Sequence, residues 1–137
     1  MKSILIIDDD TRNTFALSAV LKTKDYRTFI SGNMVEAFAL LESEKEIGII
    51  LLDMMMPGMD GYDAMPVLKT TEAYKHLPLI AVTAQAMPGD REKCMAAGAD
   101  DYIAKPVDVD LLLKILDKYF NKFQWKETCL KMRRLNC

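Results

Sequence analysis

The sequence predicts an α/β fold in which a parallel sheet carries helices on both faces. Short apolar runs alternate with stretches of helical periodicity, which is the pattern of strand-helix units joined by right-handed crossovers. The most apolar run, Ile-Ile-Leu-Leu at residues 49–52, suits a strand that is covered on both faces. With 137 residues, 50% hydrophobic and 28% charged, the chain is long enough for one globular domain.

Five apolar runs are expected to form the strands. Most contain branched side chains, and each is followed by a polar residue. The expected strands cover residues 3–7, 27–30, 49–52, 79–82 and 102–104. The third run ends at Asp53, and the proline and glycines that follow at residues 57–61 prevent the strand from continuing. Asp53 is therefore expected at the carboxyl end of a central strand.

The helices are expected where apolar residues recur at helical spacing. The expected helices cover residues 11–24, 33–44, 62–71, 88–97 and 109–120. We expect Thr11 to cap the first helix and Gly98 to end the fourth. Pro88 is expected to open the fourth helix, at a position where proline is tolerated. Pro66 lies past the first turn of the third helix and removes a backbone donor, so that helix is expected to start late or to kink.

Composition and charge exclude several classes of function. The net charge of −2 gives no overall indication of a nucleic-acid or membrane partner. No apolar stretch approaches the about 20 residues of a membrane span. The three cysteines form no CxxC pair and follow no secretory signal, so we interpret them as reduced thiols of a cytoplasmic protein. Residues 121–137 are basic, and we expect a helical extension or tail there, after a domain that covers residues 1–120.

Polar side chains follow four of the predicted strands. They are Asp8 and Asp9 after the first strand, Asp53 after the third, Thr83 after the fourth and Lys105 after the fifth. Because parallel strands place their carboxyl ends at one edge, we expect these side chains to meet in one crevice. Two carboxylates ~4 Å apart at an effective dielectric of ~20 repel by roughly 4 kcal/mol. A hard divalent cation would relieve this repulsion, and oxygen ligands without His or Cys favour Mg²⁺, or Mn²⁺, over zinc.

A cation, a lysine and a hydroxyl around a carboxylate suit phosphoryl transfer. In this hypothesis Asp53 is the nucleophile and forms an acyl phosphate, while Lys105 and Thr83 contact the phosphoryl oxygens. Each residue also has a plainer interpretation. Asp53, Asp8 or Asp10 could cap a turn or a helix, Thr83 could be a strand-end hydroxyl, and Lys105 could form a surface ion pair. Their joint placement on successive strand ends favours a site.

Four segments resemble the receiver domain of two-component response regulators. They are Ile-Leu-Ile-Ile-Asp-Asp-Asp at residues 4–10, Asp-Met-Met-Met-Pro-Gly-Met-Asp-Gly at 53–61, Ala-Val-Thr-Ala at 81–84 and Ala-Gly-Ala-Asp-Asp-Tyr-Ile-Ala-Lys-Pro at 97–106. The resemblance extends from residue 1 to about residue 120. The methionine run at 54–56 and the helix start at 12–17 are similar to receivers attached to hybrid sensor histidine kinases. The resemblance implies a flavodoxin-like, doubly wound, five-stranded sheet with the strand order 2-1-3-4-5.

The resemblance implies a chemical role for the acidic residues. Asp53 would accept a phosphoryl group from a phosphohistidine on a sensor histidine kinase or a histidine phosphotransfer protein. Asp9, Asp53 and the backbone carbonyl of Met55 would bind Mg²⁺ directly, and Asp8 would act through a metal-bound water. Such a domain is not an enzyme in the usual sense, because it catalyses only its own phosphorylation and dephosphorylation.

The resemblance also implies a switch. Lys105 and Thr83 would hold the phosphoryl oxygens, and the Lys105–Pro106 peptide bond would be cis. Phosphorylation would draw Thr83 toward the phosphoryl group and turn Tyr102 inward. This change would re-shape the face formed by the fourth helix, the fifth strand and the fifth helix, where downstream proteins usually bind. No nucleic-acid or membrane partner is implied.

A second class of function is a small phosphatase or phosphotransferase of the haloacid-dehalogenase type, which also uses a strand-end Asp with Mg²⁺. Residues 8–12 superficially resemble its first motif, but Arg12 stands where a small threonine or valine is expected. The chain also lacks room for a cap domain. A flavodoxin-type cofactor carrier is a third interpretation, although no Gly/Ser/Thr-rich phosphate loop follows the first strand.

Overall fold

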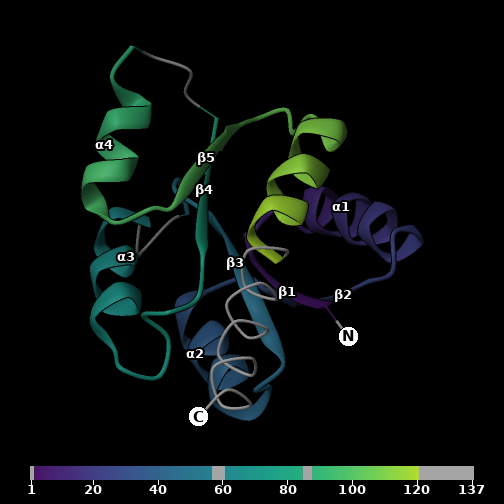
Figure 1. Ribbon diagram of the computed structural model, residues 1–137, viewed down its shortest axis with the longest axis horizontal. Coiled ribbons are helices and arrows are strands. Elements are labelled where there is room, and N and C mark those ends of the chain that lie inside the picture. Colours follow the sequence, from purple (N-terminus) through teal and green to yellow (C-terminus); the bar gives the residue numbers. More distant parts are fainter. Residues whose placement is uncertain (1, 57–60, 85–87, 121–137) are drawn as a thin grey trace, which may run out of the picture. The chain divides into compact units, whose positions relative to one another are not determined.

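A parallel five-stranded sheet organises the computed structural model, which describes residues 2–56, 61–84 and 88–120. The chain divides into two units, residues 1–107 and 108–137, and the whole sheet belongs to the first. The strands are β1 (Lys2–Ile7), β2 (Tyr26–Ser31), β3 (Ile47–Asp53), β4 (Leu79–Thr83) and β5 (Asp101–Ala104). Their order is β2-β1-β3-β4-β5 (Figure 1), which confirms the predicted doubly wound sheet.

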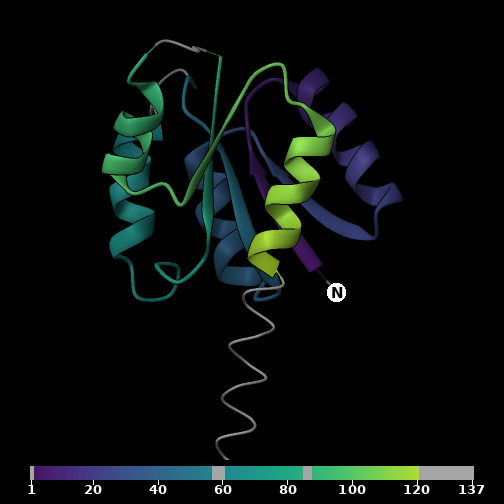
Figure 2. The same cartoon turned by 45° about the horizontal axis from the view of Figure 1, so that its top comes forward.

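In the described part of the first unit, four helices accompany the sheet. They are α1 (Thr11–Thr23), α2 (Met34–Ser43), α3 (Gly61–Thr70) and α4 (Asp90–Ala97). Figure 2 shows α1 on one face of the sheet and α3 and α4 on the other. In the second unit residues 109–120 are helical, as predicted, while the basic segment 121–137 lies outside the described residues. No helix in the described part of the chain has the length and apolar character that a membrane crossing requires.

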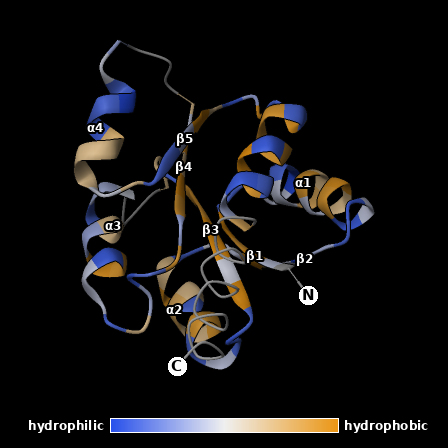
Figure 3. Ribbon diagram, in the orientation of Figure 1, coloured by the Kyte–Doolittle hydropathy of each residue, from blue (hydrophilic) through white to orange (hydrophobic). Residues whose placement is uncertain are grey.

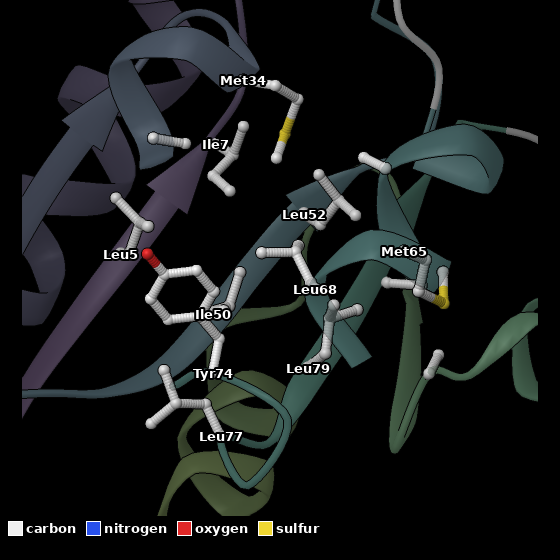
Figure 4. Packing of buried hydrophobic residues seen from close by; sticks show 14 of the residues in the cluster. Leu5, Ile7, Met34, Ile50, Leu52, Met65, Leu68, Tyr74, Leu77 and Leu79 are labelled. Carbon is white, nitrogen blue, oxygen red and sulfur yellow. The ribbon is translucent and has the colours of Figure 1, made fainter. Parts of the chain in front are cut away.

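Both faces of the sheet are buried, and β3 illustrates the reason. Alternate residues of a strand point to opposite faces, yet Ile49, Ile50, Leu51 and Leu52 are each at most 2% exposed. The side chains of Ile50 and Leu52 join the main core cluster, which includes buried residues of α2 and α3 (Figure 4). In Figure 3 the central strands are coloured largely as hydrophobic segments. Because burying one such side chain contributes about 1.5–3 kcal/mol, these runs strongly favour a central position.

The start of α1 differs from the prediction by one residue. Asp10, not Thr11, is the N-cap: its side chain accepts hydrogen bonds from the backbone N–H groups of Arg12 and Asn13. Thr11 is the first residue of the helix. Asp and Thr both cap helices well, and local sequence alone does not decide between neighbouring caps.

Two further helix starts also differ from the predictions. The helix α3 begins at Gly61 and contains Pro66; of the late start or kink expected from this proline, the late start is wrong. A proline inside a helix removes one backbone hydrogen bond, a cost that burial of the apolar side of α3 offsets. The helix α4 begins at Asp90, whereas Pro88 lies in the preceding turn. Gly98 ends α4 with a φ of 123°, as predicted.

Candidate functional site

The carboxyl ends of β1, β3 and β5 bring four predicted site residues together. One carboxylate oxygen from each of Asp8, Asp9 and Asp53 lies within 4.8 Å of the other two. Asp8 and Asp53 are buried, with 5% and 4% exposure, whereas Asp9 is exposed. The Nζ atom of Lys105 reaches the same group and lies 3.2 Å from Asp8. The convergence expected from parallel strands is therefore present, because β1 and β3 are hydrogen-bonded neighbours.

Both carboxylate oxygens of Asp8 accept hydrogen bonds. Its Oδ1 atom accepts from the backbone N–H of Asp10 at 2.9 Å. Its Oδ2 atom accepts from Nδ2 of Asn13 at 2.8 Å and from Nζ of Lys105 at 3.2 Å. Burial raises the pKa of Asp8, but these donors and the charge of Lys105 outweigh it, so the pKa lies below its ordinary value. Asp8 is thus an oriented, charged carboxylate and not a helix cap.

The pKa of Asp53 is shifted in the opposite direction from that of Asp8. Its Oδ1 atom accepts from the backbone N–H of Met55 at 3.0 Å, and its Oδ2 atom lies 3.6 Å from Nζ of Lys105. Burial and the charge of Asp8 raise the pKa of Asp53 above its ordinary value, although the Met55 N–H and Lys105 oppose them. For Lys105, burial lowers the pKa, but the charges of Asp53 and Asp8 outweigh it and raise it. The Lys105–Pro106 peptide bond is cis, as expected.

Thr83 ends β4, beside the strand that carries Asp53. Its side chain is buried and lines a cavity of about 310 Å³ with residues 54–56, Tyr62, Asp90 and Lys93. The strand-end position predicted for Thr83 is therefore correct. The cavity lies between the turn that follows β3 and the first turns of α3 and α4.

Tyr102 lies on β5, where it pairs with Ala81 of β4. It is partly buried and packs against the main core cluster. Burial and the nearby Asp90 raise the pKa of Tyr102, so its hydroxyl is neutral at physiological pH. Tyr102, the residue expected to act as a switch, therefore lies on the strand that pairs with the strand of Thr83, and its side chain is partly buried.

Four residues near the site were not identified as site residues from the sequence. The side chain of Asn13 donates a hydrogen bond to Asp8. Its position in the first turn of α1, shortly after the end of β1, could have indicated this contact from the sequence. The Tyr62 hydroxyl lies 3.4 Å from Sγ of Cys94, and Nζ of Lys93 lies 4.4 Å from the Tyr62 ring centroid. These contacts join α3 to α4 through tertiary packing, which no local pattern reveals.

Comparison with known proteins identifies the family. Residues 4–117 match the response regulator receiver domain. The chain belongs to this family. Hybrid signal transduction histidine kinase M of Dictyostelium discoideum is 35% identical over 126 residues, which are 88% of this chain but 5% of that kinase. The polar-differentiation response regulator DivK of Brucella anthropi is 31% identical over 118 residues, which are 86% of this chain and 95% of DivK.

Solved receiver structures agree with this assignment. The receiver domain of sensor histidine kinase PA1611 from Pseudomonas aeruginosa PAO1 is 33% identical, with a TM-score of 0.78 over 88% of this chain and 98% of that chain. Its crystal structure has a magnesium ion coordinated in the active site cleft. The protein described here is a receiver domain of two-component signalling systems. None of these similarities supports the haloacid-dehalogenase alternative.

Proposed function

We propose that Asp53 of this receiver domain accepts a phosphoryl group from a phosphohistidine. The observation that carries the proposal is the placement of Asp53 at the end of a central strand, with two further carboxylates and the Lys105 ammonium around it. An oxygen of Asp53 forms a bond to phosphorus while the P–N bond to the donor imidazole breaks. The imidazole keeps the bonding electron pair and takes up a proton. The product is an acyl phosphate.

Mg²⁺, or Mn²⁺ in its place, fits the donor set of this site. The cluster offers oxygen ligands from three carboxylates, with no histidine or cysteine among them, and hard divalent cations prefer such ligands. We propose that Asp9, Asp53 and the backbone carbonyl of Met55 hold the cation directly and that Asp8 acts through a bound water. When bound, the cation neutralises negative charge on the transferring group.

Lys105 and Thr83 complete the proposed site. The Lys105 ammonium lies 3.6 Å from Asp53, so a short movement carries it to an oxygen of a phosphoryl group there. The Thr83 hydroxyl stands at the end of the next strand and supplies a second, neutral donor. These residues act on the domain's own acyl phosphate, so the proposed chemistry is self-phosphorylation and self-dephosphorylation.

The proposed partners follow from this chemistry. The proposed donor is a sensor histidine kinase or a histidine phosphotransfer protein. The phosphorylated domain then binds a downstream protein through a surface that includes α4 and β5. Thr83 and Tyr102 are the proposed switch residues, since they lie on the paired strands β4 and β5. Because the donor's phosphoryl group derives from ATP, we propose a cytoplasmic location. No nucleic-acid or membrane partner is proposed.

Phosphorylation by a small donor tests the proposed function. Incubation with acetyl phosphate or phosphoramidate and MgCl₂ should add one phosphoryl group, measured by intact-protein mass, and the label should be acid-stable and base-labile. Asp53→Asn should take up none. Asp25→Asn is the matched control, because Asp25 is an exposed turn residue with a φ of 65°, a conformation that asparagine tolerates. Sustained turnover of phosphomonoesters, or no uptake from any donor with metal present, would contradict the proposal.

A further inference from the structure

In the described part of α1, Asn13 is the residue whose side chain donates a hydrogen bond to the acidic cluster. Its Nδ2 atom donates to Oδ2 of Asp8 at 2.8 Å, the same oxygen that Lys105 contacts at 3.2 Å. The backbone N–H of Asn13 donates in turn to the cap residue Asp10 at 3.3 Å. The helix cap thus fixes the backbone of Asn13, and the first turn of α1 directs its amide back to the end of β1.

Oδ2 of Asp8 and a phosphoryl group on Asp53 would compete for the ammonium of Lys105. Its ammonium lies between Asp8 and Asp53, at 3.2 Å and 3.6 Å. To follow a phosphoryl group on Asp53, it must leave Oδ2 of Asp8. A buried carboxylate oxygen that loses a donor is costly unless another donor stays in place. The amide of Asn13 is that second donor, and the N–H of Asp10 serves the other oxygen.

The side-chain amide of Asn13 is neutral, so it does not compete with a cation for the carboxylates. An arginine or lysine at position 13 would offer a hydrogen bond but would add positive charge beside the carboxylates, where it would compete with a cation. An amide orients the carboxylate and leaves its charge available. Asparagine is also short enough to act from the first turn of the helix, one turn above the strand end.

We propose that Asn13 is a positioning residue for the phosphoryl-transfer site: it holds the Asp8 carboxylate in place so that Lys105 can exchange between Asp8 and the phosphoryl group on Asp53. This inference rests on the proposed function. Asn13 acts through Asp8 and touches neither the acceptor nor the donor.

Magnesium binding and single-turnover phosphorylation test the role of Asn13. In Asn13→Ala, the Asp8 oxygen keeps only Lys105 as its side-chain donor and is less available to a cation. The Mg²⁺ dissociation constant, measured by calorimetry on the unphosphorylated protein, should rise about tenfold, the usual effect of losing a partner that orients a metal ligand. The phosphorylation rate by acetyl phosphate at saturating Mg²⁺ should also fall about tenfold, because Lys105 remains on Asp8.

The controls separate positioning from a structural role. Asn33→Ala removes an equivalent side-chain hydrogen bond at the start of α2, from the Glu36 N–H at 2.9 Å, and should change the melting temperature without changing Mg²⁺ affinity. Asn13→Leu conserves the volume of the side chain and serves if the alanine variant misfolds. In an Asp8→Asn background, Asn13→Ala should cause no further loss of rate.

The outcomes distinguish this inference from the proposed function. If the wild type binds no Mg²⁺ and takes up no phosphoryl group, the proposed function fails. If the wild type does both, and the Asn13 variants keep Mg²⁺ affinity and phosphorylation rate within twofold, the positioning role alone is overturned. A loss of rate that persists undiminished in the Asp8→Asn background would also overturn it, because Asn13 would then act independently of Asp8.

Discussion

At the scale of single residues, the surroundings of Asp53 disfavour its charged form. Burial and the nearby Asp8 carboxylate raise its pKa, and only the Met55 N–H and the Lys105 ammonium oppose them. A carboxylate in this position is less well solvated than one in water, which makes it a better nucleophile. The same conditions mean that the charged form of Asp53 costs folding free energy in the absence of a cation.

This balance predicts that Asp53→Asn stabilises the metal-free protein. The amide keeps an oxygen for the Met55 N–H but removes the repulsion with Asp8, so the free energy of unfolding in EDTA should rise by about 1 kcal/mol, an ordinary size for one substitution. The pKa of Asp53 in the folded state lies above that of the unfolded chain, so proton uptake favours folding. The advantage of the variant should therefore shrink as the pH falls through this raised pKa.

Urea unfolding at several pH values checks the Asp53 prediction. Asp25→Asn is the control, since this exposed turn residue is remote from the cluster and should leave the midpoint near that of the wild type. A lower midpoint for Asp53→Asn at neutral pH in EDTA would show that the Lys105 interaction outweighs the burial and repulsion.

The same scale shows which site residues the sequence could reveal. Asp8, Asp53 and Lys105 follow apolar runs directly, so their place at the strand ends follows from parallel topology alone. Asn13 and Tyr62 lie within helices, and the direction of their side chains depends on a cap residue and on helix packing. Hydrophobic patterns predict where a strand ends and which face of a helix is buried, but they do not predict which side chain of another element a polar residue of that helix contacts.

At the scale of elements, α3 begins in close contact with the turn that follows Asp53. Gly61 is buried, and its N–H donates to the carbonyl of Met54 at 3.3 Å. A Cβ atom at position 61 would lie 2.4 Å from Sδ and 2.8 Å from Cα of Met54. The flexible side chain of Met54 can move, but its backbone can move only if the turn that follows Asp53 shifts.

Gly61→Ala should therefore destabilise the protein by about 1–3 kcal/mol, the usual cost of forcing an added methyl group into a packed contact. Gly32→Ala is the matched control, because a Cβ atom there meets no atom within 4 Å. That control should be neutral or stabilising by about 0.4–1 kcal/mol, since alanine restricts the unfolded chain. Urea midpoints compare the two variants, and equal midpoints would show that Met54 gives way freely.

All five strands lie where the sequence placed them, whereas the cap of α1 and the role of Pro88 in α4 were predicted wrongly, for a physical reason. The runs in β3 and β4 are buried on every side, and burial of whole apolar runs outweighs any local preference. Helix starts depend on smaller terms, of about 1 kcal/mol, that neighbouring residues share. Asp10 therefore replaces Thr11 as a cap, and Pro66 is accommodated within α3 because the helix buries Met65 and Leu68 beside it.

At the scale of the whole molecule, the proposed switch links the proposed acceptor Asp53 to the surface that includes α4 and β5. Tyr102→Ala removes the ring that is expected to turn inward after phosphorylation, but leaves every residue of the proposed site intact. Phosphorylation by acetyl phosphate should proceed at the wild-type rate. The phosphorylation-dependent changes in amide chemical shifts in α4 and β5, recorded by NMR, should be reduced. Phe15→Ala is the control, because this ring is 76% exposed on α1; undiminished shifts in the Tyr102 variant would contradict the switch.

The proposed cation binding would be coupled to folding, because only the folded chain assembles the acidic cluster. Asp53 is far in sequence from the adjacent residues Asp8 and Asp9, yet one carboxylate oxygen of each lies within 4.8 Å of the others. A cation that binds the folded state alone stabilises it by RT ln(1 + [L]/Kd), which is about 2.7 kcal/mol at 100 times the dissociation constant.

The melting temperature of the wild type should therefore rise with MgCl₂ and continue to rise with the logarithm of its concentration above the dissociation constant. Asp9→Asn removes the exposed member of the cluster, which makes no described contact in the core, so its metal-free melting temperature should match or exceed that of the wild type. Its response to MgCl₂ should be much smaller. Scanning calorimetry at constant ionic strength, with NaCl replacing MgCl₂, separates binding from screening. Equal responses of the wild type and Asp9→Asn would place the cation elsewhere, because the cluster would then contribute nothing to its binding.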